Sequence, residues 1–269
     1  GKDLLPAAQI FDAAGDAPEA GTVEFKDVSF HYPASDKDVL EHISFTARKG
    51  ETVAFIGATG SGKTTLVSLA ARFYDATVGQ VLVDGVDVKD YTFDALYDRI
   101  GYVTQKAILF SGDIRSNVLF GESRGGSSDG DVQEALDLAQ ASEFVEKLPQ
   151  GIRAPIAQGG SNVSGGQKQR LSIARALARK PEILVFDDSF SALDYRTDAK
   201  LRTGLARELK DVTKLIVAQR IGTIRDADKI IVLDEGKIAG MGTHEELMRT
   251  CPVYQEIARS QLSPDELGA

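Results

Sequence analysis

Short runs of apolar residues recur along the chain and end at glycine or polar residues, a pattern typical of strands in an α/β protein. Residues 23–32 (VEFKDVSFHY) alternate apolar and polar positions, as a half-buried strand does. The same reasoning predicts further strands at residues 51–57, 79–88 with a turn at Asp84-Gly85, 100–105, 182–187, 213–219 and 229–238. Strands that alternate with helices predict a three-layer α/β core with a mostly parallel sheet.

The stretch from about 106 to 180 has a different residue pattern and is expected to form an inserted helical lobe. Residues 121–130 (GESRGGSSDG) are typical of a loop. In the helix expected after them, Val132, Leu136 and Ala139 share one face, and Asp131 is a plausible cap. The resulting domain plan is a lead-in at 1–21, one domain over 22–262 and a tail at 263–269. Within the domain, the core covers about 22–105 and 181–250 and the lobe about 106–180.

Composition narrows the class of protein. The 269 residues are 42% apolar and 26% charged, as in an ordinary soluble globular protein, and the formal net charge is −9. Without a block of lysine and arginine, nucleic acid is not an expected partner. The single cysteine, Cys251, excludes an internal disulfide and fits a reducing compartment. No leader and no run of 18 apolar residues is evident, so the chain as given is expected to be neither secreted nor membrane-spanning.

The histidines do not suggest a metal site. His31, His42 and His244 lack the spacing of metal ligands. His244 is expected to begin a helix capped by Thr243, since Glu246 follows that threonine by three residues.

A phosphate-binding loop is the strongest motif. Residues 57–64 (GATGSGKT) match G-x-x-x-x-G-K-[ST] between a predicted strand and a predicted helix. Its glycines let backbone N–H groups converge on phosphate oxygens, Lys63 can bridge the β- and γ-phosphates, and the Thr64 hydroxyl can ligate Mg²⁺. The predicted nucleotide-binding residues of this loop are Gly57, Ala58, Thr59, Gly60, Ser61, Gly62, Lys63, Thr64 and Thr65. Asp187, which ends the apolar run ILVFD, is the expected carboxylate that orients Mg²⁺.

A second motif narrows the choice of phosphate-loop family. Residues 162–177 (NVSGGQKQRLSIARAL) resemble the signature segment of ATP-binding cassette (ABC) ATPases, and the resemblance extends over about residues 22–260. It implies that Tyr32 stacks on adenine, that Gln105 joins core to lobe and helps to bind ATP and Mg²⁺, and that SALD (191–194) follows the magnesium strand. ATP and Mg²⁺ are therefore the expected ligands. The implied fold is a P-loop NTPase core of three layers with a mostly parallel sheet, an antiparallel β subdomain and an inserted α-helical lobe.

The residues of the signature also suit a second anion-binding site. Ser164, Gly165 and Gly166, with Gln167 behind them, open a helix whose N–H groups and dipole favour a phosphate. In the family, this helix end completes the ATP site of a facing subunit, so a second cassette is an implied partner. Arg170 and Arg175 are expected to support the helix by surface pairing.

Residues 109–121 (LFSGDIRSNVLFG) look like the exporter branch of the family. The resemblance implies a membrane domain that docks in the groove near Gln105, with membrane association through that domain only, at the cytoplasmic face of the plasma (inner) membrane. Residues 154–162 (APIAQGGSN) occupy the segment that faces the membrane domain's loops, and Gln158 stands where a glutamate is common.

Two residues depart from the family at the catalytic centre. Asp188 stands where most cassettes have a glutamate, the proposed general base, and losing one methylene group retracts the carboxylate by about 1.5 Å. Gln219 stands where the family has a histidine that contacts the γ-phosphate. Lys63 and Gln105 complete the expected catalytic set. This pair of substitutions resembles the slowly hydrolysing half of a heterodimeric bacterial exporter. Such a half has low ATP turnover at its own site, and its intact signature completes the ATP site of its partner.

Two alternatives remain open at this level. One is a soluble cassette ATPase that works on DNA or ribosomes, although the long coiled-coil insertions usual in that class are missing. The other is a regulatory nucleotide sensor that never hydrolyses ATP.

Overall fold

The structure, a computed structural model, describes residues 20–120 and 128–268. The expected lead-in at 1–21 therefore lies almost wholly outside the described residues, as does most of the loop expected at 121–130. The described chain forms two units, one made of residues up to Tyr97 and from Asp211 onward, and one from Asp98 to Lys210. These bounds differ from the expected division into core and lobe at 105 and 181, and the domain plan stays a prediction.

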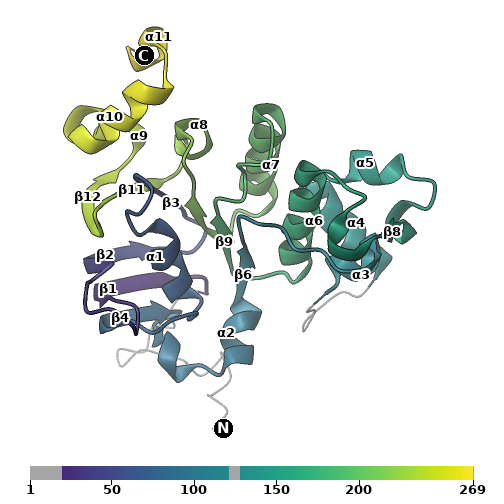
Figure 1. The fold of residues 1–269 in the computed structure, drawn as a ribbon, viewed down its shortest axis with the longest axis horizontal. Coiled ribbons are helices and arrows are strands. Elements are labelled where there is room, and N and C mark those ends of the chain that lie inside the picture. Colours follow the sequence, from purple (N-terminus) through teal and green to yellow (C-terminus); the bar gives the residue numbers. More distant parts are fainter. Residues whose placement is uncertain (1–19, 121–127, 269) are drawn as a thin grey trace. The chain divides into compact units, whose positions relative to one another are not determined.

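The first unit contains an antiparallel sheet in the order β2-β1-β4-β5 (Figure 1). Its strands are β1 (Val23–Phe30), β2 (Leu40–Ala47), β4 (Val78–Val83) and β5 (Val86–Asp87). The strand-turn-strand reading of 79–88 is confirmed, with Asp84 and Gly85 in the turn. β2 was not among the predicted strands. A bulge near His42, whose φ is +52°, breaks its alternation of buried and exposed positions and hides it from a period-two search.

The same unit contains parallel strands that carry the phosphate loop. β3 (Thr52–Ile56) pairs in parallel with β10 (Thr213–Val217) and β11 (Lys229–Asp234), and β12 (Lys237–Gly242) pairs antiparallel with β11. All five residues of β10 and four of the five in β3 are buried, as expected where both faces of a parallel sheet are covered.

The helices between Lys63 and Arg99 are α1 (Lys63–Ala70), the 3₁₀ turn η2 (Val88–Asp90) and α2 (Phe93–Arg99). The C-terminal helices, in yellow and green in Figure 1, are α8 (Ile221–Ile224), α9 (His244–Thr250), α10 (Pro252–Gln261) and α11 (Pro264–Leu267). α9 begins at His244, and the Thr243 side chain accepts a hydrogen bond from the Glu246 N–H, so the predicted cap is confirmed.

The second unit pairs β6 (Ile100–Val103) in parallel with β9 (Ile183–Asp187). Its long helices are α6 (Gly165–Ala178) and α7 (Tyr195–Glu208). The shorter elements are α3 (Ile114–Val118), α4 (Asp129–Leu138), α5 (Ser142–Glu146), η3 (Gly151–Arg153), η4 (Gln158–Gly160), β7 (Gly112–Asp113) and β8 (Pro155–Ile156). The last two form a small antiparallel pair that the helical reading of 106–180 did not include.

The start of α4 differs from the prediction. Val132 and Leu136 are buried on one face and Ala139 follows as the buried C-cap, as expected, but Ser128 rather than Asp131 is the N-cap. The Ser128 hydroxyl accepts from the Asp131 N–H at 3.1 Å, so Asp131 lies within the first turn of the helix.

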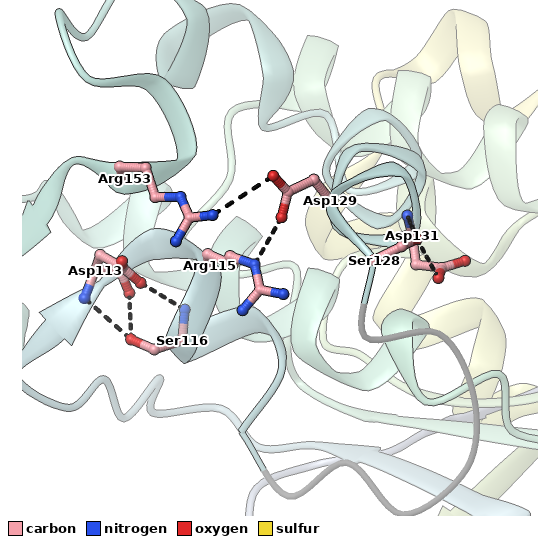
Figure 2. A network of polar contacts seen from close by, with 7 residues as sticks. All are labelled: Asp113, Arg115, Ser116, Ser128, Asp129, Asp131 and Arg153. Carbon is pink, nitrogen blue, oxygen red and sulfur yellow. Dashed lines mark hydrogen bonds and ion pairs between the residues drawn. The ribbon is translucent and has the colours of Figure 1, made fainter.

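Ion pairs hold this helix start in place (Figure 2). The Asp129 carboxylate accepts from Arg115 Nε of α3 at 2.7 Å, and Arg153 Nη2 of η3 lies 3.6 Å from its other oxygen. These arginines, Arg115 first, lower the pKa of Asp129. Each pair is exposed and contributes little singly, but together they tie α4 to two neighbouring elements.

The predicted fold class is confirmed: the chain is a mixed α/β protein with parallel strands, an antiparallel sheet and a helical segment. Among the described helices, none is long and apolar enough to cross a membrane.

Candidate nucleotide site

The predicted phosphate loop lies between the end of β3 and the start of α1. Gly60 and Gly62 have φ of +83° and +104°, a region that strains any residue with a Cβ. A Cβ on Gly57 would lie 2.3 Å from the Leu233 carbonyl oxygen in β11. Gly62, as N-cap of α1, has no side chain to bond the first turn of that helix. This conformation suits a loop in which the backbone N–H groups of a helix start bind an anion.

Two side chains of this loop fit a phosphate ligand. The Lys63 ammonium donates to the Gly57 and Ala58 carbonyl oxygens at 2.5 and 3.1 Å, so it lies across its own loop. The Ser61 hydroxyl is only 3% exposed and has no hydrogen-bond partner among the described residues. A buried hydroxyl without a partner is unfavourable, and phosphate oxygens in the loop would supply one.

Tyr32 lies beside the phosphate loop in the same unit. Its hydroxyl and the Thr65 hydroxyl of α1 are 2.7 Å apart, and its ring makes edge contacts with Phe30 and Tyr74 at centroid distances of 5.0 and 5.2 Å. The structure therefore brings the proposed adenine-stacking residue to the helix that follows the loop. A hollow of ≈ 810 Å³ opens next to Gly60, lined by residues from 35–41 and 234–239.

Asp187 is placed at the end of β9 in the second unit, as the sequence pattern predicted. It is 7% exposed, and the Tyr102 hydroxyl of β6 donates to its carboxylate at 3.5 Å. Burial, and then the charge of Asp187, raise the pKa of Tyr102. Tyr102 was not predicted as a site residue; strand pairing alone, which sets Tyr102 opposite Val185, could have suggested it.

The residues that follow Asp187 are held tightly. Asp188 has φ +52° and is half-buried. The fully buried Ser189 donates to the Val103 carbonyl oxygen at 2.7 Å, and the Ser191 hydroxyl donates to the Asp188 carbonyl oxygen at 3.1 Å. These bonds oppose a forward shift of the Asp188 backbone.

Gln219 and Gln105 are both exposed, in different units. Gln219 follows β10 in the first unit, and Gln105 follows β6 in the second. The backbone of Gln219 is bound by the side chain of Gln261, the last residue of α10. Sequence reasoning missed Gln261 because nothing local links two glutamines 42 residues apart.

The signature forms a capped helix start. The Ser164 hydroxyl accepts from the Gln167 N–H at 3.2 Å, and the Gln167 side chain accepts from the Ser164 N–H at 3.0 Å, which is a capping box. A Cβ on Gly165 would meet nothing within 4 Å, whereas one on Gly166 would lie 3.3 Å from the Ala192 carbonyl oxygen. The N-terminal face of the 14-residue α6 is therefore open at Gly165.

The two arginines of α6 bind backbone carbonyls, which the expected surface pairing did not include. Arg170 donates to the Gln140 carbonyl oxygen at 3.0 Å and lies over the Phe144 ring. Arg175 donates to the carbonyl oxygens of Asn117 and Ile108 at 2.9 and 2.8 Å. Each guanidinium presents several donors in a plane and binds backbone carbonyls of neighbouring segments.

The model of the ABC transporter family matches residues 40–191, which is more than half of the chain. The chain belongs to the ABC transporter family. The matched stretch contains the predicted phosphate loop at 57–64, the strand that ends at Asp187 and the start of α6.

Individual ABC proteins are similar over nearly the whole chain. An ABC transporter ATP-binding protein of Mycobacterium bovis is 49% identical over 245 residues, which cover 90% of this chain and 41% of that protein. An ATP-dependent lipid A-core flippase of Syntrophus aciditrophicus is 40% identical over 267 residues, or 99% of this chain and 44% of the flippase.

A solved structure of a bacterial Atm1-family ABC exporter with ATP bound has a TM-score of 0.84 and 37% identity, and covers 92% of this chain and 45% of that one. The chain thus spans less than half the length of each of these three ABC relatives.

Proposed function

We propose that this chain is the ATP-hydrolysing motor domain of an ABC exporter, and that its own ATP site is the slow one of a heterodimeric pair. The names of the relatives, an ABC exporter and a lipid flippase, support the transport class over a DNA- or ribosome-associated ATPase. The observation that carries the slow-site assignment is Asp188, an acid one methylene short on a backbone held by Ser189 and Ser191.

The residues present fit ATP and Mg²⁺. Lys63 and the start of α1 suit the phosphates, and Tyr32 suits the base. Mg²⁺ prefers oxygen ligands and is usually held by one or two carboxylates together with substrate phosphates. The Thr64 hydroxyl, the Asp187 carboxylate and the Gln105 amide oxygen are the proposed donors. When bound, the ion would offset negative charge on the phosphates.

Hydrolysis needs a base that reaches the attacking water. The Asp188 carboxylate is about 1.5 Å short of the position that a glutamate would reach. A misplacement near 1 Å can lower a rate roughly a hundredfold, and loss of a general base lowers it about 10²–10⁴-fold. Gln219 can donate a hydrogen bond to the γ-phosphate but cannot carry a positive charge, so it stabilises developing negative charge less than a histidinium does. Both departures favour ATP retention over turnover.

The signature helix is proposed to serve the other site. Ser164, Gly165 and Gly166 begin α6 with an open N-terminal face, which supports contact with the phosphates of a facing cassette. A working signature beside a slow site is the division of labour expected of one half of a heterodimer.

A patch of exposed apolar side chains supports a membrane-domain partner. Ile108, Phe110 and Phe120, which we call the aromatic patch, are 57, 43 and 53% exposed, and the two phenylalanine rings stack at 4.4 Å. Arg175 lies over both rings. Exposed apolar patches of this kind mark interaction sites. Because Ile108 and Phe110 follow Gln105 closely in the sequence, we assign the patch to docking of the membrane domain, and we propose that the chain lies at the cytoplasmic face of the membrane.

The test uses the purified chain with ATP and Mg²⁺. We expect micromolar or tighter ATP binding, slow phosphate release, and little change in turnover for Asp188→Asn. Asp187→Asn is the matched comparison and should weaken Mg²⁺-dependent binding. Brisk turnover that Asp188→Asn abolishes would contradict the slow-site assignment, because Asp188 would then be an effective base.

A further inference from the structure

The side chain of Gln261 bridges the segment that carries Gln219. Its Nε2 donates to the Gln219 carbonyl oxygen at 2.7 Å, and its Oε1 accepts from the Ile221 N–H at 2.8 Å. One amide group thus binds a backbone acceptor and a backbone donor two residues apart. This two-point contact fixes both the position and the direction of the intervening peptide groups.

The contact replaces a missing helix cap. α8 has only four residues, and its N-cap, Arg220, makes no side-chain cap bond. The Ile221 N–H lies in the first turn, where a helix offers no internal acceptor. Gln261 supplies that acceptor from a different helix. Without it, the turn between β10 and α8 loses the acceptor that its first N–H uses in this structure.

The helix that carries Gln261 is itself well anchored. Tyr254 and Ala258 of α10 are fully buried, and the Tyr254 hydroxyl is 2.5 Å from His244 Nδ1 in α9. Gln261 follows Ala258 by three residues and so lies on the same face of α10. The amide is therefore presented to the Gln219 segment from a fixed base and not from a mobile tail.

We propose that Gln261 is a positioning residue that holds Gln219 in place to contact the γ-phosphate. Through this contact, α10 contributes to the preference of the site for ATP over ADP. The proposal rests on the proposed function, in which Gln219 addresses the γ-phosphate. Since ADP has no γ-phosphate, loosening the Gln219 segment weakens binding of the triphosphate and leaves that of the diphosphate unchanged. A purely structural role would weaken both equally or lower only stability.

The experiment compares Gln261→Ala with Gln255→Ala in the full chain. Gln255 is a matched control because it is also a glutamine of α10 and also donates to a backbone carbonyl, that of Met248 at 2.8 Å, but not to the Gln219 segment. The probes are ADP and the non-hydrolysable ATP analogue adenylyl imidodiphosphate, each titrated calorimetrically with Mg²⁺. Gln219→Ala is measured alongside.

We expect Gln261→Ala to lower the preference for the triphosphate about threefold, in line with the loss of a hydrogen bond or two, and Gln255→Ala to leave it unchanged. Gln219→Ala should lower it at least as much, and the double variant no further than Gln219→Ala alone. If alanine at 261 impairs folding, Gln261→Glu keeps the length and the acceptor for Ile221 but loses the donor to Gln219, and it should show part of the same loss.

The outcomes separate the two claims. If Gln219→Ala lowers the preference and neither Gln261 variant does, the positioning role is wrong while the proposed function stands. If Gln219→Ala itself has no effect, the assigned role of Gln219 is wrong, and the coupling proposed for α10 is overturned with it. Equal weakening of both nucleotides by Gln261→Ala would show a structural role only.

Discussion

The backbone of Asp188 has φ +52°, in the left-handed region where aspartate and asparagine are the best-tolerated residues after glycine. The short acid therefore suits the backbone at this point, whereas the proposed chemistry needs the longer one. Because Ser189 and Ser191 hold the neighbouring backbone, relaxation cannot easily supply the missing reach. The slow-site proposal therefore depends on one residue whose backbone conformation favours aspartate while ATP hydrolysis favours the longer glutamate.

Restoring the family residues should restore turnover. In the double variant Asp188→Glu/Gln219→His, we expect ATP hydrolysis by the chain to rise about tenfold to a hundredfold, because the base regains its reach and the γ-phosphate gains a group that can be a cation. Phosphate release under saturating ATP measures this, with ATP affinity as the control that should stay within a few-fold. An unchanged rate at full occupancy would mean that these two positions do not limit turnover.

Removing the loop lysine should remove nucleotide affinity. Lys63→Ala deletes charge-assisted hydrogen bonds of about 1.5–3 kcal/mol each, so ATP should bind at least tenfold more weakly. Lys49→Ala, which changes an exposed lysine of the same unit, is the control and should bind as the parent chain does. Equal affinity of both variants would show that nucleotide binds elsewhere.

At the scale of elements, the proposed phosphate contacts lie at the starts of two helices. α1 follows Gly62, its N-cap, which has φ +104°, and α6 begins at Gly165, where the helix start is open. The two helix ends differ in their caps. α1 has no side-chain cap, whereas α6 has the capping box of Ser164 and Gln167.

Two serine caps in the second unit allow stability and function to be separated. Ser164→Ala and Ser128→Ala each remove an N-cap, of α6 and α4, and each should lower the free energy of unfolding by about 0.5–2 kcal/mol, measured in urea. Only Ser164→Ala should also impair ATP turnover at a partner's site. If Ser128→Ala impairs turnover as much, the effect arises from stability and not from the signature.

The helix pair α9 and α10 should make stability depend on pH. Burial, and then Arg225, lower the pKa of His244 below its ordinary 6.5, against smaller opposing effects of Glu245 and Asp226. The folded chain therefore resists protonation, while the unfolded chain takes up a proton as the pH falls through about 6.5. Above that pH this contribution to stability is complete, and it declines as the pH falls toward the lower pKa of the folded state.

We expect His244→Gln to flatten the fall in urea midpoint between about pH 7.5 and 5.5. Gln255→Ala, which changes α10 without removing an ionisable group, is the control and should keep the slope of the parent chain. A slope identical in all three proteins would show that His244 does not contribute to the pH dependence.

Elements with a strong local signal could be predicted from the sequence. The phosphate loop, the strand ending at Asp187 and the Thr243 cap all depend on residues close together in the chain. β2 could not, because its bulge breaks the alternation, and Asp131 was the wrong cap because Ser128, three residues earlier, accepts from the Asp131 N–H and begins the helix. The bridge from Gln261 to Gln219 is non-local and has no sequence signal.

For the whole molecule, the proposed division of labour needs two cassettes. This chain would hold ATP on its own phosphate loop and lend α6 to the other site. The chain spans less than half the length of these relatives, so copies of this chain alone do not test a membrane domain or a transported compound. The division of labour itself can be tested with copies of this chain alone.

Two tagged copies provide the test. The reporter copy carries Asp188→Glu, Gln219→His and Gly165→Glu. A glutamate at position 165 enters open space at a helix N-terminus, which tolerates it, but it repels a phosphate. Dimers of two reporter copies then lack a working signature, and dimers of two natural copies lack an effective general base. Fast turnover can arise only where the reporter's site meets the natural copy's signature.

The most direct measurement is ATP turnover of this mixed dimer as the natural copy is varied. We expect Gly165→Glu in the natural copy to abolish the fast phase and Asp188→Asn in the natural copy to leave it unchanged. The reverse result, loss with Asp188→Asn and persistence with Gly165→Glu, would contradict the account.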